Sequence, residues 1–408
     1  MKIKKVLYFA TLLLATTACT GKSVKITVTN TTGADRTDEL VEVYKEQIQT
    51  RLRIYDDKPF VVLDENGKQV PYQITNDGTV LFEANVKANG KAEYTVQEGQ
   101  PEKPAPCCYG NTYPKRLDDL AYENDRIGWR IYGPAAQRRG DKLYGYDIWS
   151  KRVEYPILDS LYEQDRFLNE KKAQLAKEGK KMSWDEEKTL SYHIDHGKGC
   201  DYYAVGPTLG AGTAAFISPS TGEMIYPYAY KTCEILDNGP LRFTARLTYD
   251  LMVSDVRVQE TRLISLDKGS QMTKCTVWYT NIFSQLPLAA GVVMHKGSDR
   301  VDFNVEKGYA SYVEPESEEN GTTYVGLVFP EGIEEIRVQP LGENEKDALK
   351  GGATGHLVGV TTYSPKDKFT YYYGAGWSKH GFQNDQAWFD YVKDFAARVR
   401  KPLQVKMK

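Results

Sequence analysis

The stretch RFTARLTYDL at residues 242–251 alternates polar and apolar side chains over ten positions. Successive side chains of a strand point to opposite faces, so one face of this segment is apolar and the other polar. Strand-like segments follow at residues 256–266, with Glu260 and Arg262 on the face of Val258, and at 273–282 and 289–295. Four long strands joined by short turns predict an antiparallel meander at the centre of an all-β fold.

Working outward from this meander, the sequence predicts two β-domains. Short strands between turn signals at residues 23–98 predict a small N-terminal β-sandwich, and residues 99–114 are Pro-rich and predict a linker. Residues 115–408 predict a large antiparallel β-sandwich, a supersandwich similar to that of galactose mutarotase. It carries a short charged helical insertion at 163–190 and a C-terminal helix at 383–398.

The N-terminus predicts the compartment. Residues 1–18 combine a basic start, a short apolar stretch and small residues, which is typical of a signal peptide. A small residue directly before Cys19 is the lipobox arrangement of bacterial lipoproteins, so residues 19–22 are expected to form a lipidated N-terminus. The alternative is a secreted protein with a free Cys19. We expect a lipoprotein of a Gram-negative envelope on the periplasmic side, with lipid as its membrane contact.

Composition excludes several classes of protein. Of 408 residues 41% are hydrophobic and 26% charged, which fits a folded globular chain rather than a disordered or multi-pass membrane protein. The 53 Lys and Arg against 55 Asp and Glu leave no excess of positive charge for a nucleic-acid backbone. The cysteines after Cys19 are odd in number and scattered, so they predict no disulfide framework.

The best candidate for chemistry is the segment YHIDHGKGCDYY at residues 192–203. Histidine is the usual acid or base near neutral pH, and a neighbouring tyrosine can share the proton. We therefore predict catalytic roles for His193, His196 and Tyr202, joined by His295 from the end of a predicted strand. Two other interpretations stay open: His193 and His196 with Asp201 could ligate a divalent metal, or the histidines could only shape a loop.

Two chemical routes could cleave a sugar chain. Hydrolysis needs two carboxyl groups, for which no motif singles out a pair among Asp125, Asp147, Asp250 and Glu260. β-Elimination on a uronate needs a cation, a base and an acid, which abundant Arg, His and Tyr suit better. The side chains predicted to bind substrate are arginines, an acid and two ring platforms: Arg126, Arg130, Arg246, Glu260, Trp149 and Trp377.

The chain resembles an uncharacterised family of Gram-negative lipoproteins, domain of unknown function 4861. The resemblance covers most of residues 24–400 and rests on separated motifs in order: residues 123–127 with 129–134, 146–149 with Lys151 and Arg152, 196–199 leading to 205–210, and 374–377. Members look like partners of pectin- and uronate-degrading enzymes, which implies glycan processing. The family offers no established catalytic residues to carry over.

The sequence thus predicts a lipid-anchored enzyme of polysaccharide use that cleaves a uronate- or rhamnose-containing glycan, by a lyase rather than a hydrolase mechanism. Its partner is the glycan substrate, and no cofactor is required, although a divalent metal stays open. The alternatives are a non-catalytic sugar-binding lipoprotein, whose aromatic side chains stack on sugars, and a sugar epimerase or mutarotase.

Overall fold

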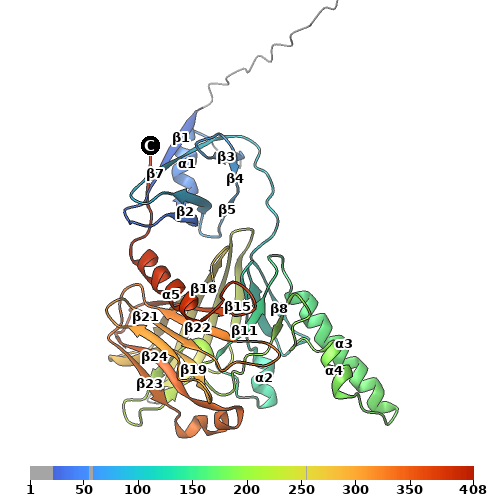
Figure 1. Cartoon of the computed structure of the whole chain (residues 1–408). Coiled ribbons are helices and arrows are strands. Elements are labelled where there is room, and N and C mark those ends of the chain that lie inside the picture. The colour runs from blue at the N-terminus through green and yellow to red at the C-terminus, as the bar shows by residue number, and fades with distance from the viewer. Residues whose placement is uncertain (1–21, 55–57, 254) are drawn as a thin grey trace, which may run out of the picture.

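A computed structural model describes residues 22–54, 58–253 and 255–408. Antiparallel sheets form a small N-terminal domain and a large sandwich-like domain, with few helices (Figure 1). The prediction of an all-β fold is confirmed. The proposed signal peptide and Cys19 lie outside the described residues.

The N-terminal domain consists of two facing sheets, in the orders β26-β1-β7-β3-β4 and β2-β6-β5. Ile26, Val62 and Phe82 belong to the apolar core between them. Its elements are β1 (Ser23–Thr29), β2 (Arg36–Tyr44), α1 (Lys45–Leu52), β3 (Phe60–Leu63), β4 (Gln69–Val70), β5 (Tyr72–Ile74), β6 (Thr79–Val86), β7 (Lys91–Glu98) and, from the far end of the chain, β26 (Gln404–Met407). Residues 23–98 therefore form all but one strand of the small sandwich, and the C-terminus supplies the remaining strand, β26.

The large domain has three sheets. The first, in the order β12-β11-β10-β9-β8, contains β8 (Tyr109–Tyr113), β9 (Asp119–Glu123), β10 (Ile127–Ile131), β11 (Tyr146–Lys151) and β12 (Gly199–Asp201). The second, in the order β14-β13-β19-β24-β23, contains β13 (Ala211–Ile217), β14 (Met224–Ile225), β19 (Leu286–His295), β23 (Glu335–Pro340) and β24 (Ala353–Tyr363). The third, in the order β15-β16-β17-β18-β25-β22-β21-β20, contains β15 (Thr232–Asn238), β16 (Arg242–Val253), β17 (Val256–Asp267), β18 (Met272–Thr280), β20 (Val301–Asn304), β21 (Tyr309–Val313), β22 (Thr323–Val328) and β25 (Phe369–Trp377).

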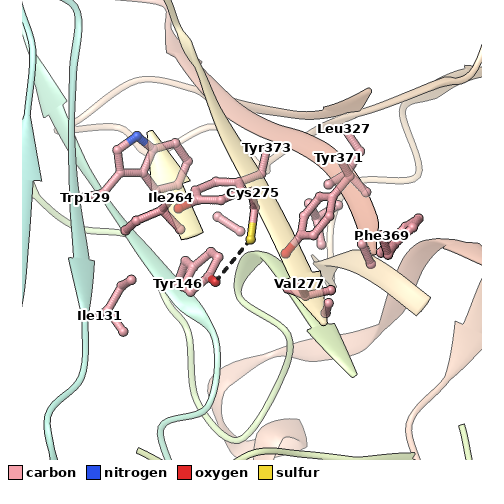
Figure 2. Packing of buried hydrophobic residues seen from close by; sticks show 14 of the residues in the cluster. Trp129, Ile131, Tyr146, Ile264, Cys275, Val277, Leu327, Phe369, Tyr371 and Tyr373 are labelled. Carbon is pink, nitrogen blue, oxygen red and sulfur yellow. Dashed lines mark hydrogen bonds between the residues drawn. The ribbon is translucent and has the colours of Figure 1, made fainter. Parts of the chain in front are cut away.

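One core lies between the eight-stranded sheet and the other two sheets, which meet at β11 and β13. It is rich in aromatic rings: Trp129 packs edge-on against Tyr373, and Tyr146 lies beside the same ring (Figure 2). The Tyr146 hydroxyl lies 4.0 Å from the Cys275 sulfur. Many of the tyrosines therefore serve the core rather than a sugar-binding surface.

The predicted four-strand meander holds for three strands only. β16, β17 and β18 are neighbours, but β19 crosses to the second sheet. The physical reason is that β19 is buried on both faces, with Leu288 and Val292 in the main core and Ala289 in a second apolar cluster. A strand that is apolar on both faces is stable only where both are covered.

Two helical regions accompany the sandwich. The insertion forms α3 (Leu158–Lys177) and α4 (Trp184–Leu190), which together start five residues before the predicted range and project from the large domain (Figure 1). Gly179, with a φ of 67°, lies between the two helices, and Ser183 and Glu186 form a capping box at the start of α4. Near the C-terminus α5 (Asp385–Arg400) lies against β21 and β22 through Trp388 and Val392. Two short elements complete the fold: α2 (Pro134–Arg139) and the 3-10 helix η1 (Glu343–Gly351).

The predicted linker at 99–114 is shorter than expected, because β8 within it pairs with β9. The five cysteines after Cys19 are free thiols. Within the described ranges, no helix is both long and apolar enough to cross a membrane.

Candidate active site

A buried cluster of charges lies on the face of the β8–β12 sheet that points away from the main core. Arg130 on β10 is directly opposite Asp147 on β11 and forms an ion pair with it. Asp201 on β12 places its Oδ2 2.9 Å from the same guanidinium nitrogen. The guanidinium carbon lies 4.9 Å from the ring centre of Tyr132 and 5.3 Å from that of Trp149. We call Asp119, Arg130, Asp147 and Asp201 the Arg130 cluster.

The helical insertion explains why these charges are buried. The first turns of α3 bury Leu158, Leu161 and Tyr162 against this face of the sheet, together with Trp149 and Tyr192. The buried Glu123 carboxylate accepts hydrogen bonds from the backbone N–H groups of residues 157 and 158, at 2.8 and 2.9 Å. The start of α3 is thereby fixed over the sheet.

Burial changes the protonation of the cluster. Desolvation raises the pKa of Asp147 to about 7, with a further rise from the charge of Asp201 and an opposing effect from Arg130. Desolvation also raises the pKa of Asp119 to about 6. Asp119 and Asp147 are thus carboxylic acids that gain or lose protons close to neutral pH, beside one buried arginine.

His193 lies between the buried Arg130 cluster and the surface of the protein. Its Nδ1 lies 2.5 Å from the backbone carbonyl oxygen of Asp201, which can only accept, so Nδ1 carries the proton. The Asp201 carboxylate is 3.9 Å from the same nitrogen, and the Tyr192 ring is 4.2 Å from the imidazole centre. The side chain is 56% exposed. His193 is thus an oriented imidazole whose Nε2 is the nitrogen left to take up a proton.

A second histidine lies in a more enclosed place. His295, at the end of β19, places Nδ1 2.8 Å from Glu314, whose pKa is raised by desolvation. The Tyr203 ring is edge-on to His295, and its buried hydroxyl has no hydrogen-bond partner among the described residues. After desolvation, the charges of Glu314 and Asp147 both raise the pKa of Tyr203. Tyr203 therefore lies beside the His295–Glu314 pair, at the edge of the main core.

The other residues of the histidine segment hold the loop together. His196 places Nε2 3.0 Å from the Ser191 carbonyl oxygen, so this ring donates to the backbone. The Tyr202 hydroxyl accepts a hydrogen bond from Thr323 at 2.6 Å. These contacts give His196 and Tyr202 structural partners, and their catalytic roles stay predictions.

Four of the predicted substrate-binding residues lie where a ligand has little or no access. The two predicted ring platforms, Trp149 and Trp377, are buried, and Trp377 donates from Nε1 to the Asn320 carbonyl at 2.6 Å. Arg130 is also buried, although the prediction places it correctly beside the histidine loop. Glu260 is fully buried and paired with Arg262 in the main core. These side chains help to form the scaffold of the protein.

The remaining two predicted arginines are at the surface but away from the Arg130 cluster. Arg246 forms an exposed ion pair with Glu234 at 2.5 Å, on strands at the other edge of the fold. Arg126 pairs with Asp125 at 3.2 Å and lines a cleft between the two domains. The sequence pattern places both arginines on strands. Only the order of the strands in the sheets shows which side chains lie next to each arginine.

The metal site that the sequence left open is not formed among the described residues. In residues 22–54, 58–253 and 255–408, no group of three or more His, Cys, Asp or Glu side chains is placed to hold a metal ion. His193 and His196 each direct a ring nitrogen at a backbone carbonyl, and Asp201 pairs with Arg130. These contacts orient the three side chains.

Sequence reasoning missed Asp119, Tyr203 and Glu314. Tyr203 lies in the segment 192–203, next to the tyrosine that was chosen, but adjacent residues contact different neighbours. Asp119 and Glu314 have no motif of their own, since strand pairing alone brings them to this region. The sequence therefore carried a signal for Tyr203, which lies in the segment 192–203, but none for Asp119 or Glu314.

The family model for a domain of unknown function, DUF4861, matches residues 28–405. The chain belongs to this family. The chain is also similar to "Uncharacterized protein P7" of Formosa agariphila, 27% identical over 432 residues and aligned over 99% of both chains.

Two solved structures from Enterococcus faecalis are also similar: an alpha-mannosidase, with a TM-score of 0.48, and a glycosyl hydrolase family 38 protein, with 0.49. Each is 10% identical and matches 95% of this chain. The DUF4861 chain spans less than half of their length, 46% and 47%.

Proposed function

We propose that this protein is a carbohydrate-active enzyme that cleaves a uronate- or rhamnose-containing glycan by β-elimination, with His193 as the base. The observation that carries the proposal is the exposed His193 ring, oriented through Nδ1 by Asp201 directly beside the Arg130 cluster. An imidazole fixed at one nitrogen presents the other as a base.

The positions of the carboxylates favour elimination over hydrolysis. Hydrolysis needs two carboxyl groups that flank the scissile bond. Asp147 and Glu260 are fully buried, Asp125 accepts from the Gly269 backbone at 2.7 Å, and Asp250 pairs with Lys231 at 2.6 Å. Each of the four has a local structural partner, whereas His193 is free to meet a substrate.

Elimination also needs a cation that neutralises the uronate carboxylate, because the C5 proton is acidic only then. Arg116 fits this role: it donates to the Tyr192 hydroxyl at 3.2 Å, lies 3.1 Å from Asp165 and is one third exposed. The Tyr192 ring lies tilted against His193, with ring centres 4.2 Å apart. The proposed cation and base thus both contact Tyr192, Arg116 at the hydroxyl and His193 at the ring.

The step balances as follows. Nε2 of His193 takes the C5 proton of the uronate, the freed electron pair forms the C4–C5 double bond, and the C4–O bond breaks. The leaving oxygen takes a proton from solvent, and the imidazolium later returns its proton to solvent. We extend the proposal to a lipid anchor at Cys19 on the periplasmic side, which is supported by the pattern of residues 1–19.

Ultraviolet absorbance of the new double bond tests the reaction. With uronate oligosaccharides, His193→Gln should lower kcat/KM by about 100-fold or more, the usual range for loss of a general base. His380→Gln, a change in a histidine outside the segment 192–203, is the matched control and should retain activity. Product formation by the His193 variant at the wild-type rate would contradict the assignment. Retention of a glycan without product by the wild-type protein would favour the sugar-binding alternative instead.

A further inference from the structure

A cleft of about 930 Å³ separates the N-terminal domain from the outer face of the eight-stranded sheet. Its floor is formed by outward-facing residues of β16, β17, β18 and β25, one wall by α5, and the other wall by β2 and residues 75–77. The volume is within the usual range for ligand pockets, about 300–1,000 Å³. This cleft is separate from the Arg130 cluster and has no part in the reaction proposed above.

Polar contacts between the N-terminal domain and the large domain fix the two sides of the cleft relative to each other. Gln73 of the N-terminal domain accepts from the backbone N–H of Arg242 at 2.8 Å and donates to its carbonyl at 2.9 Å. Arg242 also bridges to Glu42 at 2.7 Å, and Lys268 pairs with Glu83 at 2.9 Å. Two domains joined in this way form a preorganised cleft, which lowers the entropic cost of binding a ligand.

The floor carries a continuous row of polar side chains. Strand register places Asp237 opposite Thr244, Thr244 opposite Ser265, Ser265 opposite Lys274, and Lys274 opposite Tyr372. All five residues line the cleft. Neighbouring strands are about 4.8 Å apart, so the row extends over roughly 19 Å, the length of a short oligosaccharide.

Lys274 is the unusual member of this row. The other basic side chains that line the cleft each have an acidic partner: Arg126 with Asp125, Arg242 with Asp267, Lys268 with Glu83, and Arg398 with Asp394. Lys274 is exposed, and its side-chain Nζ has no ion pair or hydrogen bond with any described residue. Its ammonium group is therefore available for an anion in the ligand.

The aromatic side chains add a surface for sugar rings. Tyr372 packs edge-on against Phe395 of α5, with ring centres 5.1 Å apart, and both line the cleft. Desolvation raises the pKa of Tyr372 to about 12, so its hydroxyl stays a neutral donor. Hydroxyls, one free cation and aromatic rings are the groups that recognise an acidic sugar.

We propose that this cleft is a binding site for an acidic oligosaccharide, which lies along the Asp237–Tyr372 row with an anionic group on Lys274. Isothermal titration calorimetry in the His193→Gln background measures binding without turnover. The probes are a trigalacturonate, a sulfated oligosaccharide and an uncharged oligosaccharide of the same length. Lys274→Met should weaken binding of an anionic probe about 10-fold, the usual effect of losing one charge-assisted contact.

The matched control is Lys91→Met, a change in an exposed strand lysine outside the cleft. It should leave binding unchanged, and an unchanged Tm would show that the Lys274 variant is folded. A selective loss for the trigalacturonate assigns a carboxylate, and one for the sulfated probe assigns a sulfate. Equal binding of charged and uncharged probes, an unaffected Lys274 variant, or no binding at all would overturn the proposal. Cleavage by the wild-type protein is scored separately, so either proposal can fail while the other stands.

Discussion

Glu260 and Arg262 are a charged pair in the middle of an apolar core. Both are fully buried on β17, where Arg262 also donates to the Tyr146 hydroxyl at 2.8 Å and to the Ala214 carbonyl at 3.0 Å. Its guanidinium carbon lies 4.6 Å from the Tyr249 ring centre. Arg262 is thus held by buried neighbours, and Glu260 is its buried counter-ion. Glu260 is therefore part of the core and not a ligand for substrate.

Replacement of Glu260 should affect stability rather than substrate binding. Glu260→Gln leaves the Arg262 charge uncompensated, and we expect a loss of about 3–5 kcal/mol in the free energy of unfolding. Denaturant unfolding measures it. Arg246→Gln breaks the exposed pair with Glu234 and serves as the control, with an expected change below about 1 kcal/mol. A raised KM with unchanged stability in the Glu260 variant would instead support the role in substrate binding.

At the scale of elements, β26 connects the two ends of the chain. It pairs with β1 from Ile26 with Met407 to Thr29 with Gln404, and Val405 and Met407 pack on the N-terminal core. Arg36 donates to the Lys401 carbonyl at 2.6 Å, just after α5. The last residues therefore protect the edge of β1 and attach the N-terminal domain to α5 (Figure 1).

Removal of residues 404–408 should destabilise the N-terminal domain. The deletion exposes the β1 edge and takes away two apolar contacts, so we expect a loss of about 2–4 kcal/mol. Hydrogen exchange at the β1 amides and calorimetry measure the effect. Lys406→Ala keeps the backbone pairing and should behave like the wild-type protein, since Lys406 is exposed. Unchanged protection of β1 after the deletion would show that β26 contributes nothing to this sheet.

At the scale of the whole molecule, several buried carboxyl groups bind protons more tightly in the folded than in the unfolded chain. Desolvation raises the pKa of Asp119 to about 6 and that of Asp147 to about 7, and it also raises the pKa of Glu123, Glu314 and Glu345. Between pH 4 and pH 7 the folded state therefore holds more protons than the unfolded state. Stability falls as pH rises through this window.

The protein should thus be more stable at pH 5.5 than at pH 8, by about 1 kcal/mol. The buried His356, whose pKa desolvation lowers to about 3, offsets part of the carboxyl effect because it takes up a proton in this window only when unfolded. Asp147→Asn removes one of the responsible groups and should reduce the difference. Asp250→Asn, at an exposed pair with Lys231, should not. Thermal unfolding at the two pH values measures both. Higher stability at pH 8 in the wild-type protein would show that the cluster is ionised in the folded state.

Local patterns determined much of this fold. The alternation along residues 242–251 became a paired strand, and the turn signals within residues 23–98 include residues 64–68, which join the paired strands β3 and β4. Side-chain period and turn chemistry act over a few residues. The same alternation placed Glu260 and Arg262 on the Val258 face, which is the core face. The prediction that Glu260 binds substrate therefore conflicted with the pattern itself.

The sequence by itself determined the β-class, the helix caps and the loop that carries His193. Only the tertiary structure decided that β19 leaves the meander, that β26 joins β1, that Asp119 belongs to the Arg130 cluster, and that Tyr203 and Glu314 lie beside His295. The physical reason is the distance along the chain over which each effect acts. Propensity and periodicity act between near neighbours, whereas sheet order and the burial that shifts a pKa depend on contacts between residues far apart in the chain.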